Sequence, residues 1–393
     1  MVNVRGHCEP RLAAVRDAFI ENFEQGGEVG ASVACVVDGR TVVDLTGGHV
    51  DREKTAEWAS DTLVNVFSTT KGMTALCANQ LMDRGELDPD APVAAYWPEF
   101  GAEGKDELPV RWLLSHQAGL PAIRTPHPEE VLYDWERMTQ ALAAERPWWI
   151  PGTRAGYHAV TFGHLVGEVV RRISGESLGA FFRRNVAEPL GVDFHIGLPE
   201  SEHARVSPTL GSIVGPKIQE GAAKLTGPLA DFVRDMADPT TMVGAAFNNP
   251  HQRRDSSNSA AWRSAEIPAA NGHGTALAIA RVYGALARGG ELDGLTLLSP
   301  AAIERASTEQ VFGADAVLGG MKMRYGMGFM LRHDGMPLGP SLRAFGHPGA
   351  GGSIGFADPD TKLGFGYTMN RMRAGLVGGP GAYQLIRAFY GCL

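Results

Sequence analysis

Hydrophobic residues near the N-terminus recur first with the period of a helix and then with that of strands. Residues 10–25 form the predicted helix, which Gly26 ends. Its apolar face consists of Leu12, Val15, Phe19 and Phe23. Two β-branched runs follow within residues 30–48 and flank Asp38-Gly39, a pair suited to the positive φ angles of a tight turn. The pattern therefore predicts a β-hairpin.

The middle of the chain has a mainly helical pattern. A strand-like run at 63–67 leads directly into a helical segment at 69–85. Helical patterns then dominate residues 108–192. The stretch 195–262 lacks sustained periodicity, so we expect loops and short helices there.

The C-terminal third returns to strands. A helix at 275–288 precedes them, and a last helix follows Pro380. The predicted strands lie around 326–332, 342–346, 352–357 and 363–369. Strands at both chain ends with helices between them predict one sheet built from both termini, with a mostly helical region inserted.

Composition excludes several classes of protein. The chain has 393 residues, of which 44% are hydrophobic and 20% charged, and the net charge is −8. An acidic surface repels phosphate, so we expect neither nucleic acid nor an anionic membrane as a partner. Four cysteines are scattered without a CxxC pair, which indicates reduced thiols. The N-terminus has no apolar run of secretory length, so we expect a cytoplasmic protein, and a homo-oligomer is left open.

Ser68 and Lys71 are the sharpest chemical signal. They are three positions apart at the start of a predicted helix, so their side chains share one face and can meet. A lysine amine whose pKa is depressed can remove the serine proton and so produce a nucleophile. The amides of a helix N-terminus can also polarise an oxyanion. The alternative interpretation is a capping Ser68 beside an exposed Lys71.

Two further segments contain candidate functional groups. Tyr157 lies on a glycine-flanked loop and could present its hydroxyl to a cleft, although a packed core tyrosine is the alternative. The run 345–353 is rich in glycine, which implies close approach of a backbone or a ligand. The 12 histidines show no HExxH or other ligand spacing, so no metal is expected.

The order of these motifs resembles the serine β-lactamase and penicillin-recognising fold. An SxxK motif at Ser68, a tyrosine before a helix, and a His-x-Gly strand near the C-terminus occur in that order. The chain is most similar to the class C-related carboxylesterases of family VIII. Further segments that support the resemblance are 84–88, 110–120, 325–329 and 364–370.

This resemblance implies an α+β fold of the β-lactamase/transpeptidase type. Residues 1–66 and 270–393 would form an α/β domain whose antiparallel sheet is flanked by helices. Residues 67–269 would form a mostly helical domain, with 195–262 rich in loops. The active site would lie in the cleft between the two domains.

The resemblance also implies roles for individual residues. Ser68 would be the acyl-accepting nucleophile, Lys71 its proton partner and Tyr157 the second acid/base. Either Lys71 or Tyr157 could take the first proton. The backbone N–H groups of Ser68 and Ala350 would form the oxyanion hole. No cofactor is implied, and the substrate would be a small-molecule ester.

Two departures from the family pattern bear on the substrate. The family's Tyr-x-Asn is Tyr157-His158-Ala159 here, so an amide that contacts the acyl group of a β-lactam is missing. His347 stands where lysine is common, and a neutral imidazole captures a carboxylate weakly. Both changes favour a short-chain carboxylic ester over a lactam. The expected substrate-binding residues are His347, Gly349, His158 and Trp149.

Other functions on the same fold stay open. These are β-lactamase, D-alanyl peptidase, amidase and acyltransferase activities, because all share an acyl-enzyme. A homologue that only binds ligands is disfavoured by the intact Ser68, Lys71 and Tyr157.

Three other motifs receive structural interpretations. Ser353 lies in a GxSxG pattern, but a nucleophile elbow needs a following helix, and a strand is predicted there instead. Ser115-His116 is expected to form a structural turn. Residues 271–274 are expected to cap the helix that follows.

Overall fold

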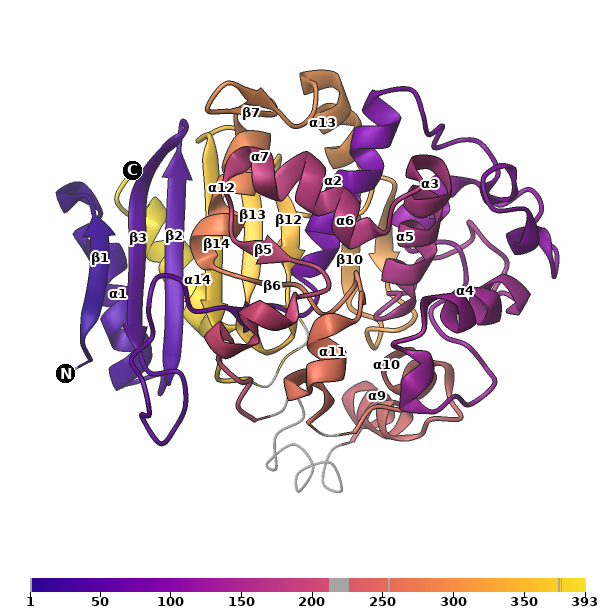
Figure 1. Ribbon diagram of the computed structural model, residues 1–393, viewed down its shortest axis with the longest axis horizontal. Helices are drawn as coiled ribbons and strands as arrows, with labels where there is room; N and C mark the ends of the chain where they lie inside the picture. The colour runs from indigo at the N-terminus through magenta and orange to yellow at the C-terminus, as the bar shows by residue number, and fades with distance from the viewer. Residues whose placement is uncertain (1, 212–225, 254, 374, 376) are drawn as a thin grey trace.

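The computed structural model describes residues 2–211, 226–253, 255–373, 375 and 377–393. Its main feature is a nine-stranded antiparallel sheet, whose arrangement can be followed in Figure 1. The strand order is β1-β3-β2-β14-β13-β12-β11-β10-β9. The strands are β1 Val4–Cys8, β2 Gly30–Val37, β3 Arg40–Gly48, β9 Val311–Ala314, β10 Lys322–Tyr325, β11 Met330–Leu331, β12 Phe345–Pro348, β13 Ile354–Asp358 and β14 Leu363–Met369.

The two chain ends meet in the middle of this sheet. The predicted hairpin is confirmed as β2 and β3, with Asp38 and Gly39 at φ angles of 47° and 82°. β14 pairs with β2 in an antiparallel register that places Phe365 opposite Cys35. A strand from near the C-terminus thus completes a sheet begun near the N-terminus. The expected α+β fold with a sheet from both chain ends is confirmed.

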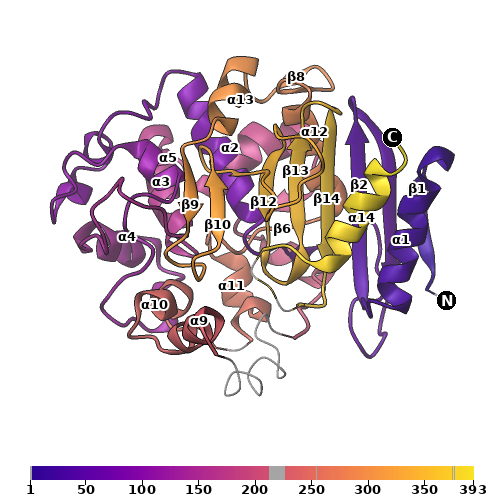
Figure 2. The same ribbon diagram turned by 180° about the vertical axis from the view of Figure 1, so that it is seen from behind.

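Helices cover both faces of the sheet. α1 (Ala13–Glu24) and α14 (Pro380–Tyr390) pack against each other on the face seen in Figure 2, and α12 (Ala276–Ala287) packs on the opposite face. The predicted helices at 10–25, at 275–288 and after Pro380 are thereby confirmed.

Most of the remaining helices lie between β4 and α12 in the sequence. They are α2 Thr70–Asp83, α3 Val110–Leu114, α4 Trp135–Ala144, α5 Thr161–Ser174, α6 Leu178–Phe182, α7 Glu188–Leu190, α9 Pro228–Ala237, α10 Met242–Asn248 and α11 Ala260–Ser264. The described part of 195–262 consists of loops and short helices, as expected, while 212–225 and 254 lie outside the described residues. Within the described residues, no helix is both long and apolar enough to cross a bilayer.

Some elements differ from the prediction. The edge strands β1 and β9 were not expected, because their side chains are largely polar or half exposed and lack a continuous apolar run. Only Met330–Leu331 of the predicted strand 326–332 is extended in the sheet, and the preceding glycines form the turn after β10. Residues 271–274 do not cap α12. They include the strand β6 (His273–Gly274), and the Thr275 side chain caps the helix.

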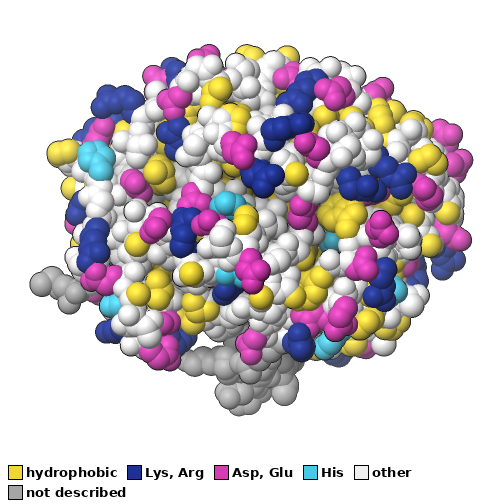
Figure 3. All heavy atoms as spheres, in the orientation of Figure 1, with side chains coloured by type: hydrophobic (Ala, Val, Ile, Leu, Met, Phe, Trp, Pro, Cys, Tyr) yellow, Lys and Arg dark blue, Asp and Glu magenta, His cyan; other side chains and the backbone are white. Residues whose placement is uncertain are grey.

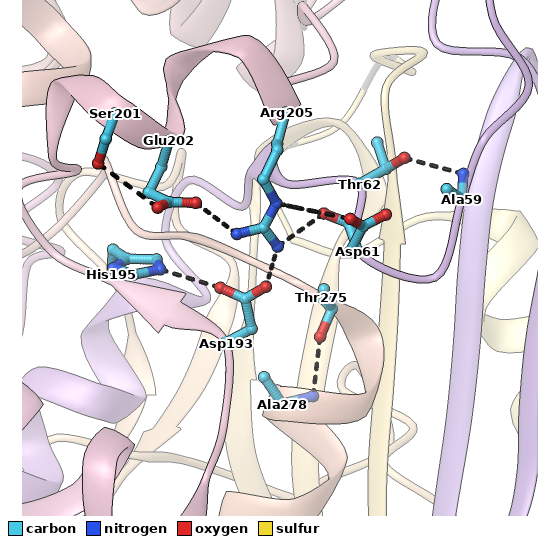
Figure 4. A network of polar contacts seen from close by, with 10 residues as sticks. All are labelled: Ala59, Asp61, Thr62, Asp193, His195, Ser201, Glu202, Arg205, Thr275 and Ala278. Carbon is cyan, nitrogen blue, oxygen red and sulfur yellow. Dashed lines mark hydrogen bonds and ion pairs between the residues drawn. The ribbon is translucent and has the colours of Figure 1, made fainter.

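A smaller sheet supports the segment that leads into Ser68. β4 (Val64–Asn65) and β5 (Phe194–His195) both pair with β6, and two-residue strands β7 (Glu291–Leu292) and β8 (Leu295–Thr296) form a separate hairpin before α13 (Pro300–Ser307). Arg205 connects the segments on either side of the smaller sheet through contacts with Asp61, Asp193 and Glu202 (Figure 4).

The Arg205 guanidinium contacts Asp193 and Glu202 and donates to the backbone carbonyl of Asp61 at 2.9 Å between Nη2 and O. The backbone N–H of Leu63 also donates to the Arg205 carbonyl at 3.0 Å. The entry to β4 is therefore fixed by both side-chain and main-chain bonds.

The surface has mixed charge. On the face shown in Figure 3, basic and acidic side chains are interspersed, and no single basic patch dominates it. All four cysteines are free thiols.

Close packing of α12 on the sheet depends on glycine. A Cβ on Gly364 would lie 2.1 Å from the backbone nitrogen of Gly284 and 2.2 Å from the carbonyl oxygen of Ala280. These are backbone atoms of α12, which cannot rotate away. We expect Gly364→Ala to lower the free energy of unfolding by about 3 kcal/mol, the upper range for overpacking a core. Urea denaturation measures it.

Gly313 provides the matched control on the same sheet. It lies in β9, and a Cβ there meets no atom within 4 Å. Gly313→Ala should change the free energy of unfolding by less than about 0.5 kcal/mol. Equal stability of the two variants would contradict the packing argument.

Candidate active site

Ser68 lies on a strained turn between β4 and α2. The residue before it, Phe67, has a φ of 46°, which is rare for a bulky side chain. Backbone contacts with residues 271 and 272 hold this conformation. Phe67 forms a β-bridge with Asn271, and the Val66 N–H donates to the Gly272 carbonyl at 2.9 Å. Strain of this kind persists where surrounding structure enforces it, and it is concentrated at functional sites.

Lys71 is fully buried, and its amine contacts Ser68. The Nζ atom lies 3.2 Å from the Ser68 Oγ, 2.7 Å from the Ala159 carbonyl oxygen and 2.9 Å from the Ala269 carbonyl oxygen. Among the ion pairs of the described residues, none includes Lys71. Burial therefore lowers the pKa of the Lys71 amine well below its usual value.

A neutral amine, which burial favours, can also make these three contacts. An ammonium group has three donors and no acceptor, whereas the deprotonated amine has two N–H groups and one lone pair. When the amine is neutral and the two carbonyls accept its two N–H groups, the lone pair is left for the Ser68 hydroxyl. The geometry thus allows Ser68 to donate its proton to Lys71.

The loop carrying Tyr157 is fixed by its backbone. The Tyr157 N–H donates to the Asp315 Oδ1 at 3.0 Å, and the Gly156 N–H donates to the His116 carbonyl at 3.0 Å. The His158 N–H donates to the His116 Nδ1 at 3.1 Å. His116 itself has a φ of 60° in the turn that was expected at Ser115-His116.

The Tyr157 side chain lies against the Ser68–Lys71 pair. Its ring centroid is 4.8 Å from the Lys71 Nζ. Burial raises the pKa of Tyr157, a hydrogen bond with Ser68 opposes this, and the charge of Asp315 adds to the increase. The phenol is therefore protonated at neutral pH. The structure brings the three sequence-predicted residues together.

Asp315 is a site residue that sequence reasoning missed. The carboxylate is fully buried and accepts from the backbone N–H groups of Tyr157, Val317 and Leu318 and from the Tyr325 hydroxyl at 2.7 Å. It therefore joins the Tyr157 loop to the end of the large sheet. The only sequence signal is a lone acid among small and apolar residues, because its partners are mostly backbone amides.

His347 lies on β12 beside the site. Its Nδ1 lies 2.7 Å from the Pro348 carbonyl oxygen, so that nitrogen carries the proton. Burial lowers the pKa of His347 to about 3. The imidazole is neutral, and its ring centroid is 6.0 Å from that of Tyr157.

Gly349 and Ala350 continue from this strand. A Cβ on Gly349 would lie 2.1 Å from the Ser353 Oγ and 2.3 Å from the Val66 carbonyl oxygen, so only glycine fits. Among the hydrogen bonds of the described residues, neither the Ser68 nor the Ala350 backbone N–H donates to a protein acceptor. Both residues line the same cavity. Two N–H donors at one cavity wall are what an oxyanion hole requires.

Ser353 has a structural environment. It is buried, and its Oγ donates to the Val66 carbonyl at 2.8 Å and lies 3.1 Å from the Thr69 Oγ1. The strand β13 follows it, not the helix of a nucleophile elbow.

His158 and Trp149 are both buried. The His158 Nδ1 is 2.7 Å from the Gly156 carbonyl oxygen, and its Nε2 accepts from the Leu120 N–H at 3.1 Å. Both ring nitrogens therefore have protein partners. Trp149 is 8% exposed and packs against Gly156. Neither residue is among the described residues that line the cavity.

The cavity in front of Ser68 has a volume of about 190 Å³. Its described lining residues are Phe67, Ser68, Tyr157, Ala159, Val160, Thr209, Gly211, Phe247, Gln252, Arg253, Ser256, Ser257, Trp262, Ala270, Ala350 and Met372. Most of these side chains are apolar or neutral. Several come from the stretch 195–262, which the sequence pattern left least defined.

The fold and this arrangement define a protein of the β-lactamase/transpeptidase type. The beta-lactamase family model matches residues 15–386, and the chain belongs to that family. It is 38% identical over 398 aligned positions to the esterase/beta-lactamase LipL of Mycobacterium tuberculosis, covering 98% of this chain and 88% of LipL.

Solved structures agree with this assignment. A family VIII carboxylesterase is 43% identical with a TM-score of 0.90, and a penicillin-binding protein homologue from Caulobacter crescentus is 41% identical with a TM-score of 0.90. Each of these two alignments covers 100% of this chain and 100% of the matched chain. The predicted resemblance is confirmed.

Buried neutral histidines make stability depend on pH. His164 on α5 is fully buried against Trp135, and burial lowers the pKa of His164 from 6.5 to about 4. Between these values the unfolded chain binds a proton that the folded chain does not. The free energy of unfolding should therefore fall as pH drops from 6.5 to 4, by up to about 3 kcal/mol from this residue. Denaturant unfolding at several pH values measures it.

Two variants test the assignment to His164. His164→Phe keeps an aromatic ring in contact with Trp135 and should reduce the loss of stability between pH 6.5 and 4. The exposed His7 offers a control, because His7→Gln should leave that loss unchanged. An unchanged pH dependence in His164→Phe would count against a neutral buried imidazole.

Proposed function

We propose that the protein hydrolyses small carboxylic esters through an acyl-enzyme on Ser68. One observation carries this proposal: the buried Lys71 amine, which has no ion-pair partner among the described residues, lies 3.2 Å from the Ser68 Oγ. A neutral amine at that distance can accept the hydroxyl proton, which an alcohol must lose to become an effective nucleophile. Membership of the beta-lactamase family and similarity to a family VIII carboxylesterase support the same reaction class.

In the acylation half, Lys71 takes the Ser68 proton as the Oγ attacks the ester carbonyl carbon. The carbonyl π electrons move to oxygen, and the N–H groups of Ser68 and Ala350 stabilise the resulting charge. When the tetrahedral intermediate collapses, the bond to the leaving oxygen breaks. The proton held by Lys71 reaches that oxygen through the Tyr157 hydroxyl, and a neutral alcohol departs.

Deacylation reverses these roles with water. The Lys71–Tyr157 pair accepts a proton from water as its oxygen attacks the acyl carbon. Collapse of the second intermediate releases the carboxylic acid, and the Ser68 Oγ regains a proton from the pair. We assign the first base to Lys71, because burial keeps Tyr157 protonated.

Two features favour an ester over a β-lactam. His347 is neutral and cannot attract a lactam carboxylate by charge. Ala159 carries no amide at the position where the family usually has asparagine. We further propose that His158 and Trp149 shape the cavity from behind, and that Gly349 lets the His347 strand approach Ser68.

The two serines can be distinguished by mutation. Ser68→Ala should lower kcat/KM for a 4-nitrophenyl ester by at least about a thousandfold, because the nucleophile is lost. Ser353→Ala should keep most of the activity. It should lower the free energy of unfolding, because the Val66 carbonyl oxygen and the Thr69 Oγ1 lose their hydrogen-bond partner at Ser353. Labelling by a fluorophosphonate probe, followed by peptide mass analysis, should identify Ser68. Labelling of Ser353 would overturn the proposal.

The acidic side of the pH–rate profile should report Lys71. A protonated amine cannot accept the Ser68 proton, so kcat/KM should fall as pH drops through the depressed pKa of Lys71. Tyr157→Phe should lower the rate yet keep this acidic limb at the same pH. Disappearance of the limb in Tyr157→Phe would instead assign the titrating group to Tyr157.

A further inference from the structure

Arg253 lies in the wall of the cavity in front of Ser68. Among the described residues that line it, only Arg253 carries a charge. Lys71 and His347 are not among these described lining residues, and both are buried, with exposed fractions of 0% and 1%. Within the described wall, Arg253 is therefore the counter-charge available to an anionic group of a substrate.

Arg253 is anchored through one edge of its guanidinium. Its Nε donates to the Glu129 Oε2 at 2.6 Å, and Glu129 is only 5% exposed. The Tyr133 hydroxyl donates to the other carboxylate oxygen at 2.5 Å. Burial acts to raise the pKa of Glu129, but hydrogen bonds from Ser256, Tyr133 and Arg253 outweigh it and lower the pKa. Glu129 is thus a firmly ionised support.

The other end of the guanidinium is open. The Arg253 side chain is 74% exposed, and in the described part of the chain neither Nη atom has a protein hydrogen-bond acceptor. The planar fork of arginine can bind both oxygens of a carboxylate through two N–H donors. Anchoring at Nε lowers the side-chain entropy that binding would otherwise cost.

We propose that Arg253 is a specificity-determining residue that binds a carboxylate on the acyl or alcohol portion of the ester. This inference rests on the proposed function and refines it, because it makes the preferred substrate a half-ester of a dicarboxylic acid or an ester of a hydroxy acid. The reacting ester carbonyl stays in the neutral part of the cavity near Ser68. The carboxylate stays at the partly exposed rim.

Two pairs of substrates test the proposal. The first pair is 4-acetoxybenzoate and 4-methylphenyl acetate, which differ in the charge of the leaving group. The second pair is 4-nitrophenyl hydrogen adipate and 4-nitrophenyl hexanoate, which differ in the charge of the acyl group. We expect the wild type to have a kcat/KM about tenfold higher for the anionic member of at least one pair, as for a charge-assisted hydrogen bond. High salt should reduce this preference.

Variants assign the preference to the side chain. In Arg253→Gln the kcat/KM values of the preferred pair should become equal, and Arg253→Lys should retain part of the difference. Arg343 is a matched control, because it is 69% exposed and its Nη1 lies 2.8 Å from the Asp360 Oδ1, on a different part of the molecule. Arg343→Gln should change neither value.

The outcomes separate this inference from the function on which it rests. Loss of all turnover in Ser68→Ala, with equal rates on both members of both pairs in the wild type, overturns the role of Arg253 alone. An anionic preference that survives in Arg253→Gln overturns it too. Full turnover of every ester by Ser68→Ala overturns the proposed function.

Discussion

Burial of the Lys71 amine, with no counter-ion among the described residues, is the constraint on which the candidate site depends. Moving a charged amine out of water is costly, so the group becomes neutral and its lone pair is available. The carbonyls of Ala159 and Ala269 satisfy its two N–H groups, which fixes the direction of that lone pair. A nearby carboxylate would restore the charge and remove the base. The absence of an acidic partner for Lys71 among the described residues is therefore as important as its contact with Ser68.

The two carbonyls that Lys71 contacts belong to segments that are far apart in the sequence. Ala159 follows the Tyr157 loop, and Ala269 precedes the small strand that supports Ser68. One amine therefore bonds both segments to α2. Asp315 fixes the same loop from the opposite side through the Tyr157 N–H. The position of the phenol is thus set by backbone bonds, and its own hydroxyl remains available for proton transfer.

The sequence could predict the parts of this structure that have local causes. The hairpin, α2 and the Ser68–Lys71 contact depend on spacing within one element, and each was predicted from periodicity or from a one-turn separation. Tyr157 needed a family resemblance, because no local pattern relates it to Ser68. Asp315 and the edge strand β9 could not be predicted, since backbone amides and neighbouring strands stabilise them. Arg253 lies in a stretch without periodicity, and only tertiary structure brings it to the cavity.

The groups proposed for catalysis and the residue proposed for substrate selection differ in how deeply they are buried. The groups proposed to move protons, Lys71 and Tyr157, are buried, and burial keeps them neutral. Their interactions with a substrate therefore depend weakly on its net charge. Charge recognition would also be costly there, because an anion near Lys71 would raise its pKa and protonate the base. A cation at the rim avoids this conflict, since Arg253 is solvated on one side and supported by Glu129 on the other. Its exposure also limits its contribution, because water screens it. We therefore expect changes at the rim to alter which ester is preferred, while changes at Lys71 alter whether any ester reacts.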